Sequence, residues 1–186
     1  MSMKRPRYNM RRVKWIGAEA LGVPGQRTFR LLAYSDAMSA QLWLEKELLQ
    51  ALTEYIARML LQIDQEKGVD LRREAAPGAE SKPADFPTAP DLDFQVVKFG
   101  LRYDPEQDLI ALEAFDRDTE EEDAPPTFRC LTTRRQMESL QMNSLEVIAA
   151  GRPRCPLCGA PLDYAGMPHF CPPTNGHQKL VEEGED

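Results

Sequence analysis

The sequence lacks long apolar runs, has only two histidines in 186 residues and carries fewer basic than acidic side chains. Its first 22 residues have a basic start, but the apolar part is short and is interrupted by Glu19 and Gly22. We therefore expect neither a signal peptide nor a membrane-spanning helix. The formal net charge of −7 argues against wholesale binding to nucleic acid or to an anionic membrane surface. A globular protein is predicted, because 42% of the residues are apolar.

Cysteine is also scarce, and its distribution is informative. Three of the four cysteines lie in one cluster and Cys130 stands alone, which is not the pattern of a secreted disulfide framework. We therefore expect a cytoplasmic protein. Cys130 lies in a predicted strand and is interpreted as a small buried hydrophobic residue. A nucleophilic role would need a nearby base, and both histidines lie in the C-terminal segment.

Uneven charge and proline content predict the domain boundaries. Residues 1–12 form a basic N-terminal arm, since positions 1–14 hold six basic residues and no acid. Residues 68–93 are proline-rich and predict a flexible linker, whereas residues 116–126 predict a solvated acidic loop. The main domain is expected over 13–150, followed by a small unit at 151–178 and an acidic tail at 179–186.

Hydrophobic periodicity predicts the same order of elements twice. Strands are expected at 13–21, 27–34 and 39–45 and a helix at 46–65; strands are then expected at 94–103, 108–115 and 126–133 and a helix at 133–150. The predicted fold class is α+β, with two β-β-β-α units that form a mostly antiparallel sheet domain, in one sheet or two packed sheets, with two covering helices. An internal duplication is one interpretation, and a chance recurrence is the other.

The segment CPLCGAPLDYAGMPHFCPPTNGH, residues 155–177, predicts a metal site. Cys155 and Cys158 have the spacing of a zinc knuckle, and Cys171 opens a second stretch of similar pattern. The fourth ligand is either His169 or His177. A unit this small has little core, so a structural Zn²⁺ is the expected cofactor, because bound zinc stabilises small peptides by about 10–16 kcal/mol. A Cys-x-x-Cys redox pair and a loop without metal are the alternatives.

Several of these motifs resemble one family. Gly-x-Pro-Gly-Gln-Arg-Thr-Phe at 22–29, Leu-Glu-Lys at 44–46, AGRPRCPLCGAPLD at 150–163 and His-Phe-Cys-Pro-x-x-Asn-Gly at 169–176 are similar to the bacterial family catalogued as domain of unknown function 3090, over about residues 13–177. The resemblance implies a C-terminal zinc-ribbon-like unit with His169 as the fourth ligand. This chain departs from the pattern by inserting Met167 and Pro168 before that histidine.

The same resemblance implies no established activity. Members are described as repeat-containing proteins of Actinobacteria and Chloroflexi, often encoded near a phosphoglycerate-mutase-like protein and a kinase-like protein. That neighbourhood suggests a shared pathway and assigns no role.

Three function classes follow. We favour a protein-protein binding or assembly module with a structural zinc site and an unidentified protein partner. An enzyme, or an accessory subunit in a pathway with kinase-like and phosphomutase-like proteins, is the first alternative; it would need an open metal position or a cleft lined by groups such as Asp104, Glu113, Arg129 or Arg134. Nucleic-acid binding through the zinc unit and basic arm is less favoured, because residues 151–186 carry three basic and five acidic side chains. The oligomeric state is not predicted.

Overall fold

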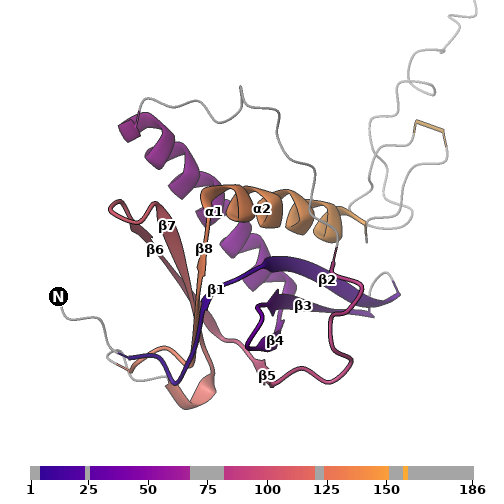
Figure 1. Ribbon diagram of the computed structural model, residues 1–186. Coiled ribbons are helices and arrows are strands. Elements are labelled where there is room, and N and C mark those ends of the chain that lie inside the picture. The colour runs from indigo at the N-terminus through magenta and orange to yellow at the C-terminus, as the bar shows by residue number, and fades with distance from the viewer. Residues whose placement is uncertain (1–4, 24–25, 68–81, 120–123, 151–156, 159–186) are drawn as a thin grey trace, which may run out of the picture.

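Eight strands and two long helices form the part of the chain that the structure describes (Figure 1). The structure is a computed structural model and describes residues 5–23, 26–67, 82–119, 124–150 and 157–158. In chain order the elements are β1 Tyr8–Arg12, β2 Trp15–Val23, β3 Gln26–Tyr34, β4 Ser39–Leu44, α1 Lys46–Lys67, β5 Leu92–Gln95, β6 Lys98–Asp104, β7 Leu109–Phe115, a short 3-10 helix at Arg117–Thr119, β8 Phe128–Thr132 and α2 Arg134–Ala149. The α+β fold class predicted from the sequence is confirmed.

The strands form two four-stranded sheets. Sheet A has the order β1-β8-β7-β6 and sheet B has the order β5-β4-β3-β2. In each sheet the three strands that precede a helix are antiparallel, and the fourth strand pairs in parallel: β1 with β8, and β5 with β4. The chain halves β1–α1 and β5–α2 thus have the same element order, and the first strand of each half extends the sheet of the other half.

The predicted strand at 94–103 was wrong in one respect, because it is two strands in different sheets. β5 ends at Gln95 in sheet B, and β6 begins at Lys98 in sheet A. Between them, the amide of Val96 donates to Trp43 O of sheet B at 2.8 Å and the amide of Val97 donates to Phe115 O of sheet A at 2.9 Å. Apolar residues continue through the crossing, so the hydrophobic pattern gave no sign of it.

The structure also contains a strand that was not predicted, within the basic N-terminal arm. Residues 8–12, which belong to the predicted basic arm, form β1 and pair with β8 from Tyr8↔Phe128 onward. Met10 points into the core and is 5% exposed. Because β1 is short and rich in arginine, its pairing could not be predicted from local pattern.

Both predicted helices are present, and α1 continues past the predicted end at residue 65 to Lys67. Its buried face consists of Leu49, Leu52, Thr53, Ile56, Leu60 and Ile63, whereas Tyr55 is 43% exposed. α2 begins with a capping box: the side chain of Thr133 accepts from the amide of Gln136, and the side chain of Gln136 accepts from the amide of Thr133. Among the described residues, neither helix combines the length and the apolar character needed to cross a bilayer.

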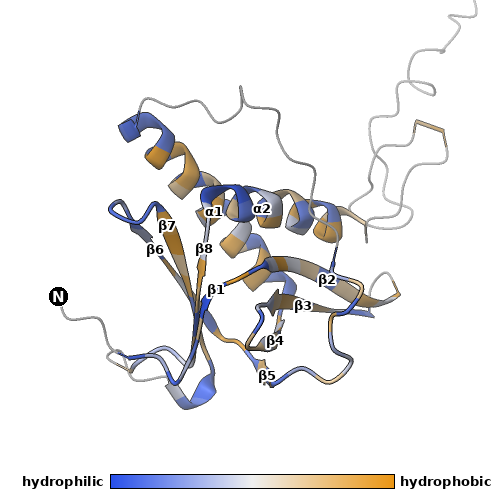
Figure 2. Cartoon of the chain, in the orientation of Figure 1, coloured by the Kyte–Doolittle hydropathy of each residue, from blue (hydrophilic) through white to orange (hydrophobic). Residues whose placement is uncertain are grey.

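One hydrophobic core lies between the inner faces of the two sheets and the helices. Sheet A contributes residues such as Leu112 and Phe128, sheet B contributes residues such as Leu31 and Leu42, and α2 contributes Met137. Figure 2 shows the corresponding pattern: the central strand β7 is hydrophobic, whereas the turn between β6 and β7 is hydrophilic. Each sheet therefore has a second, outer face that this core does not cover.

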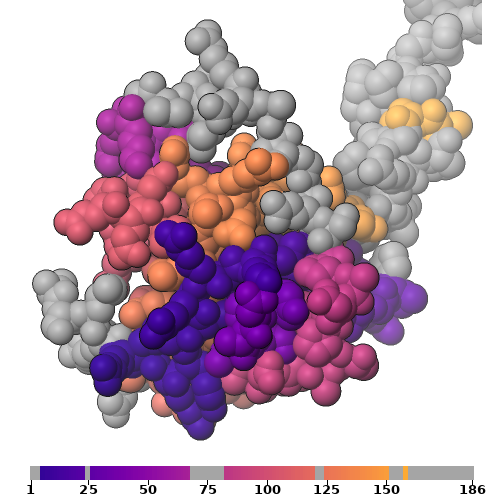
Figure 3. Space-filling model, viewed as in Figure 1, coloured from indigo at the N-terminus to yellow at the C-terminus, as the bar shows by residue number. Residues whose placement is uncertain are grey.

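The outer face of sheet B is covered by part of the predicted linker. Residues 68–81 lie outside the described residues, but residues 82–91 pack against β2, β3 and β4 (Figure 3). Phe86 lies edge-on to Trp15 with ring centroids 6.2 Å apart, and Asp91 accepts from the amide and the hydroxyl of Ser39 at 2.8 and 2.7 Å. Leu32, which points to this outer face, is consequently 0% exposed.

Candidate functional site

The predicted metal ligands lie almost wholly outside the described residues. This is true of Cys155, His169, Cys171 and His177, whereas Cys158 is described and is half-buried. The predicted zinc site therefore stays a prediction. Within the described ranges, no group of three or more histidine, cysteine, aspartate or glutamate side chains is arranged to hold a metal ion.

The helix that leads into this segment is held at its C-terminal end. Arg27 on β3 donates from its Nη1 to Val147 O at 2.8 Å and from its Nη2 to Ile148 O at 3.2 Å. The last carbonyls of a helix have no hydrogen-bond donors within the helix and carry partial negative charge. A guanidinium group supplies both the donors and a positive charge. Arg27 thereby fixes the position of α2 just before residue 151.

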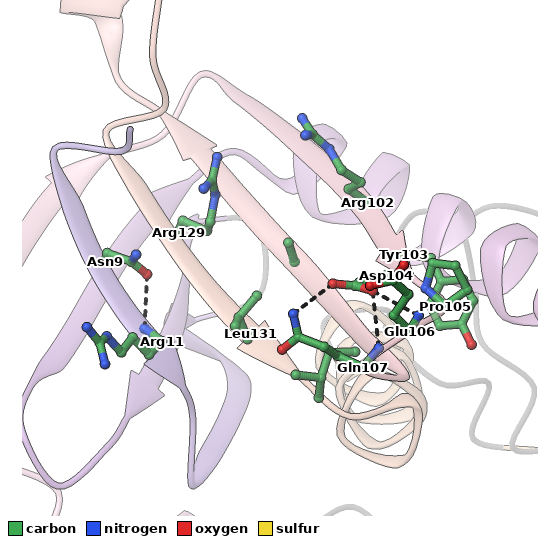
Figure 4. Close-up of a pocket in the computed structure, with 12 residues that line it drawn as sticks. Asn9, Arg11, Arg102, Tyr103, Asp104, Pro105, Glu106, Gln107, Arg129 and Leu131 are labelled. Atoms are coloured by element: carbon green, nitrogen blue, oxygen red, sulfur yellow. Dashed lines mark hydrogen bonds between the residues drawn. The ribbon is translucent and has the colours of Figure 1, made fainter. Parts of the chain in front are cut away.

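A cavity of about 540 Å³ opens on the outer face of sheet A (Figure 4). All four strands of the sheet contribute to it, together with the turn between β6 and β7. We call it the arginine cavity; its lining residues are Asn9, Arg11, Arg102, Tyr103, Asp104, Pro105, Glu106, Gln107, Leu109, Ala111, Arg129 and Leu131. Its volume is in the range of small-molecule sites, about 300–1,000 Å³.

The floor of the arginine cavity is apolar and follows from the strand register. Leu131 on β8 lies opposite Ala111 on β7, and Ala111 lies opposite Arg102 on β6. Side chains two residues apart on a strand share a face, so Leu109 joins Ala111 on the outer face. Leu109 is 3% exposed and Ala111 is 8% exposed, so the floor is recessed although neither α1 nor α2 covers it.

A buried ion pair borders the floor. Arg129 donates from Nε and Nη2 to Glu113 Oε1, at 2.8 and 2.6 Å, and both side chains are about one-tenth exposed. The other oxygen, Glu113 Oε2, lies 3.7 Å from Arg102 Nη2, beyond hydrogen-bond length. The carboxylate thus neutralises Arg129 closely and Arg102 only loosely.

Arg11 reaches the cavity from a distorted strand. The β1–β8 register shifts between Asn9 and Arg11, which marks a bulge, and Arg11 has φ = 56°. Asn9 Oδ1 accepts from the Arg11 amide at 3.1 Å and supports this turn. A positive φ is costly for a residue with a Cβ, and bulges redirect side chains, so the bulge decides where the Arg11 side chain lies at the β1 edge of the cavity.

The opposite end of the cavity is a closed polar turn. Asp104 Oδ1 accepts from the amides of Glu106 and Gln107 at 3.0 and 3.1 Å, and its Oδ2 accepts from Gln107 Nε2 at 2.9 Å. This is the hydrogen-bonding pattern of an Asx turn, which aspartate favours. Figure 4 shows these bonds beside the floor. The carboxylate of Asp104 is therefore committed to the turn.

A second charged cluster joins the β6–β7 hairpin to both helices. Asp108 accepts from Tyr103 Oη at 2.6 Å and Lys67 Nζ at 2.8 Å, and its Oδ1 lies 3.1 Å from Arg134 Nε. Hydrogen bonds from Lys67 and Tyr103 lower the pKa of Asp108 to about 2. Arg134 also contacts Asp64 at 3.5 Å. These contacts fasten the hairpin and give Asp108 little strength as a base.

The four residues that the sequence suggested for a catalytic cleft are divided by the structure. Asp104 and Arg129 line the arginine cavity, and Glu113 pairs with Arg129 at its border, whereas Arg134 belongs to the Asp108 cluster. The cavity lies on the outer face of sheet A and combines β1 of the first half with β6, β7 and β8 of the second half.

Cys130 is placed as predicted. It points into the core from β8 and is 0% exposed, and burial raises the pKa of its thiol to about 12. A thiol that remains protonated at neutral pH is a poor nucleophile. Cys130 is therefore a packing residue.

Fold and site together define an α+β protein with two sheets that exchange one strand each. The outer face of sheet B is covered by residues 82–91, and the outer face of sheet A contains the arginine cavity. The family model described as a protein of unknown function, DUF3090, matches residues 8–171, and the chain belongs to this family. No curated protein matches the chain. No solved structure matches it either.

Sequence reasoning missed three elements of the cavity: Arg11, Arg102 and the apolar floor. Arg11 was assigned to a solvated arm, and the floor residues were counted only as strand residues. The signal that was available is the alternation of β7 and β8, in which leucine and alanine occupy outward positions beside charged residues. Recognising it requires the register of four strands from both ends of the chain.

Proposed function

We propose that this protein is a non-catalytic binding module: the arginine cavity is its binding site, and the segment 151–178 is a small unit held by one structural Zn²⁺. The cavity carries the proposal. It has the volume of a ligand site, a recessed floor and charged side chains at its border, which are the features of binding pockets in general.

The side chains of the cavity support binding more than catalysis. General acid-base or nucleophilic chemistry needs a nucleophile within reach of a base. In the lining, Asp104 is committed to a turn, and the hydroxyl of Tyr103 donates to Asp108, whose pKa of about 2 makes it a weak base. An enzymatic role therefore stays the alternative.

The zinc part of the proposal is supported by ligand spacing in the sequence and by the anchoring of α2. Cys155, Cys158, Cys171 and His169 are the proposed ligands, with His177 as the alternative to His169. Four protein ligands would leave no open position, which is typical of structural zinc sites. The protein partner and the cytoplasmic location also remain predictions.

The structure weakens the argument from the sequence for nucleic-acid binding. The idea depended on a free basic arm, but residues 8–12 are paired in β1, and Met10 is buried. A strand fixed in a sheet cannot wrap around a phosphate backbone.

Metal analysis of the purified full-length chain tests the zinc site. We expect about one zinc per chain, since a set of four ligands fills one tetrahedral site. Cys158→Ser should release the metal, and Cys130→Ala is the matched control, because it removes a thiol in the core of sheet A. Zinc loss greater for His177→Ala than for His169→Ala would reverse the ligand choice, and a metal-free wild-type protein would refute the site.

A further inference from the structure

We infer that the arginine cavity binds a small organic oxyanion, a molecule with a flat apolar body and one phosphate or carboxylate group. This inference rests on the proposed binding role and assigns the chemical class of the ligand. The body would lie on the floor of Leu109, Ala111 and Leu131. The oxyanion would lie at the Arg129 end of that floor, where the exposed side chains of Arg11 and Arg102 can turn toward it from the two edges of the sheet.

The floor favours an apolar body. An outer sheet face exposed to water normally carries polar side chains, yet these three outward positions are apolar. Removing apolar area from water contributes about 25 cal/mol per Å², so a flat ligand body gains by covering the floor. An inorganic ion alone would leave this area wet.

The charges away from the β6–β7 turn favour an anion, whereas the acidic residues of the lining, Asp104 and Glu106, lie in that turn. Arg129 is neutralised by Glu113, but Arg102 is exposed and its nearest acid contact is 3.7 Å away. Arg11 is also exposed. The two side chains come from β1 and β6, the opposite edges of sheet A, so they flank the cavity. Guanidinium groups bind carboxylate and phosphate with paired hydrogen bonds.

The strained backbone of Arg11 is the independent observation. Its φ of 56° costs folding free energy, and Asn9 supplies the hydrogen bond that holds the bulge. A glycine would adopt this conformation without strain. The arginine at this position keeps a guanidinium group at the β1 edge of the cavity, where a glycine would leave none.

The size of the cavity favours a small molecule over a macromolecule. A recess of about 540 Å³ encloses a ligand, whereas a nucleic acid would need an extended basic surface. The chain as a whole carries a net charge of −7, which opposes such a surface.

Titration calorimetry of the full-length protein with four probes tests the inference. The probes are 1-naphthyl phosphate, 1-naphthoate, 1-naphthol and inorganic phosphate. The first two combine an aromatic ring with an anionic group, 1-naphthol has the ring without the anion, and inorganic phosphate is the anion without the ring. We expect 1-naphthyl phosphate or 1-naphthoate to bind about 10-fold or more tightly than 1-naphthol and inorganic phosphate, which corresponds to one charge-assisted hydrogen bond. The stronger of the two ligands identifies the oxyanion.

Variants assign the binding to the cavity. Arg102→Gln and Arg11→Gln should each weaken the affinity about 10-fold. Arg58→Gln is the matched control, because Arg58 is an exposed arginine on α1, away from the cavity, and should leave the affinity unchanged. Arg11→Gly should lose affinity equally while the melting temperature is kept or raised, which separates loss of a ligand contact from loss of fold.

Two results would overturn the inference. If 1-naphthol binds as tightly as 1-naphthyl phosphate and is indifferent to Arg102→Gln, the ligand is not an oxyanion, although the cavity remains a binding site. If none of the probes binds at millimolar concentration, the assigned ligand class is wrong. Release of 1-naphthol from 1-naphthyl phosphate, abolished by Arg102→Gln, would instead support the oxyanion site and refute the non-catalytic role.

Discussion

Sheets A and B have the same arrangement of three antiparallel strands and one parallel strand, but their outer faces differ: the face of sheet B is covered, whereas the face of sheet A contains a cavity. In sheet B, Arg30 bonds Glu19 at 2.6 and 3.1 Å and Gln41 at 2.6 Å, and residues 82–91 lie over the neighbouring positions. In sheet A, the matching row holds Glu113 and Arg129, and the next row opens into the arginine cavity. A sheet face becomes a site where its charges are paired incompletely and the described residues of the chain do not cover it.

Trp15 and Gly17 show how sheet B is closed. A Cβ on Gly17 would lie 2.5 Å from Cζ2 of Trp15, so only glycine lets the indole lie across this strand. Phe86 then packs edge-on against that indole. The described part of sheet A has no aromatic pair of this kind on its outer face, and the difference can be tested by the following changes, taken from the largest expected effect to the smallest.

Breaking the ion pair on sheet A should have the largest effect. Glu113→Ala removes the carboxylate from Arg129, which is only about one-tenth exposed, and should lower the free energy of unfolding by about 2–3 kcal/mol. Glu19→Ala on sheet B should cost under about 1 kcal/mol, because Glu19 is more exposed and Arg30 keeps Gln41. Urea denaturation measures both, and equal losses would show that the two pairs are equivalent.

Uncovering sheet B should have the next largest effect. Phe86→Ala removes the ring that contacts Trp15 and Tyr34, and because Phe86 is half-buried we expect a loss of about 1–2 kcal/mol. Hydrogen exchange should accelerate in β2–β4 and not in β6–β8. Faster exchange in both sheets would mean that residues 82–91 support the whole core.

Releasing the end of α2 should cost less. Arg27→Met keeps much of the side-chain length but removes two hydrogen bonds to Val147 O and Ile148 O, so we expect a loss of about 1 kcal/mol. Amide exchange should increase over residues 147–150. If zinc retention also falls, the anchor supports the C-terminal unit; exchange that does not change at all would show that Arg27 does not hold the helix.

The pH dependence of the Asp108 cluster should be the smallest effect. The folded-state pKa of about 2 lies below the ordinary 3.8, so this carboxylate stabilises the fold fully above about pH 4 and loses its contribution as pH falls through 2. Asp108→Asn tolerates the φ of 53° and removes the charge, and it should flatten the stability curve in that window. Because the side chain of Asp108 is 45% exposed, solvent screens its charge interactions and keeps this contribution to stability small. An unchanged acid limb measured by circular dichroism would contradict the assignment.

Particular residues show how far sequence reasoning reached. The helix from Thr133 was predictable, because Thr133 and Gln136 form a capping box within four residues and the apolar spacing is local. The split at Val96 and Val97 was not predictable, since both valines continue an apolar run and only their hydrogen bonds to different sheets separate them. The arginine cavity was least predictable, because Arg11 and Leu131 become neighbours only when β1 pairs with β8.

The sequence by itself determined the α+β class, both helices, the burial of Cys130 and the crowding of cysteine and histidine after Ala150, because each depends on periodicity or spacing within a short stretch. Tertiary structure alone decided the exchange of β1 and β5 between sheets, and with it the face that the described part of the chain leaves open. The physical reason is that pairing between strands far apart in the chain, such as Tyr8 with Phe128 and Ala40 with Leu92, satisfies backbone hydrogen bonds and buries apolar area at positions that no local pattern marks.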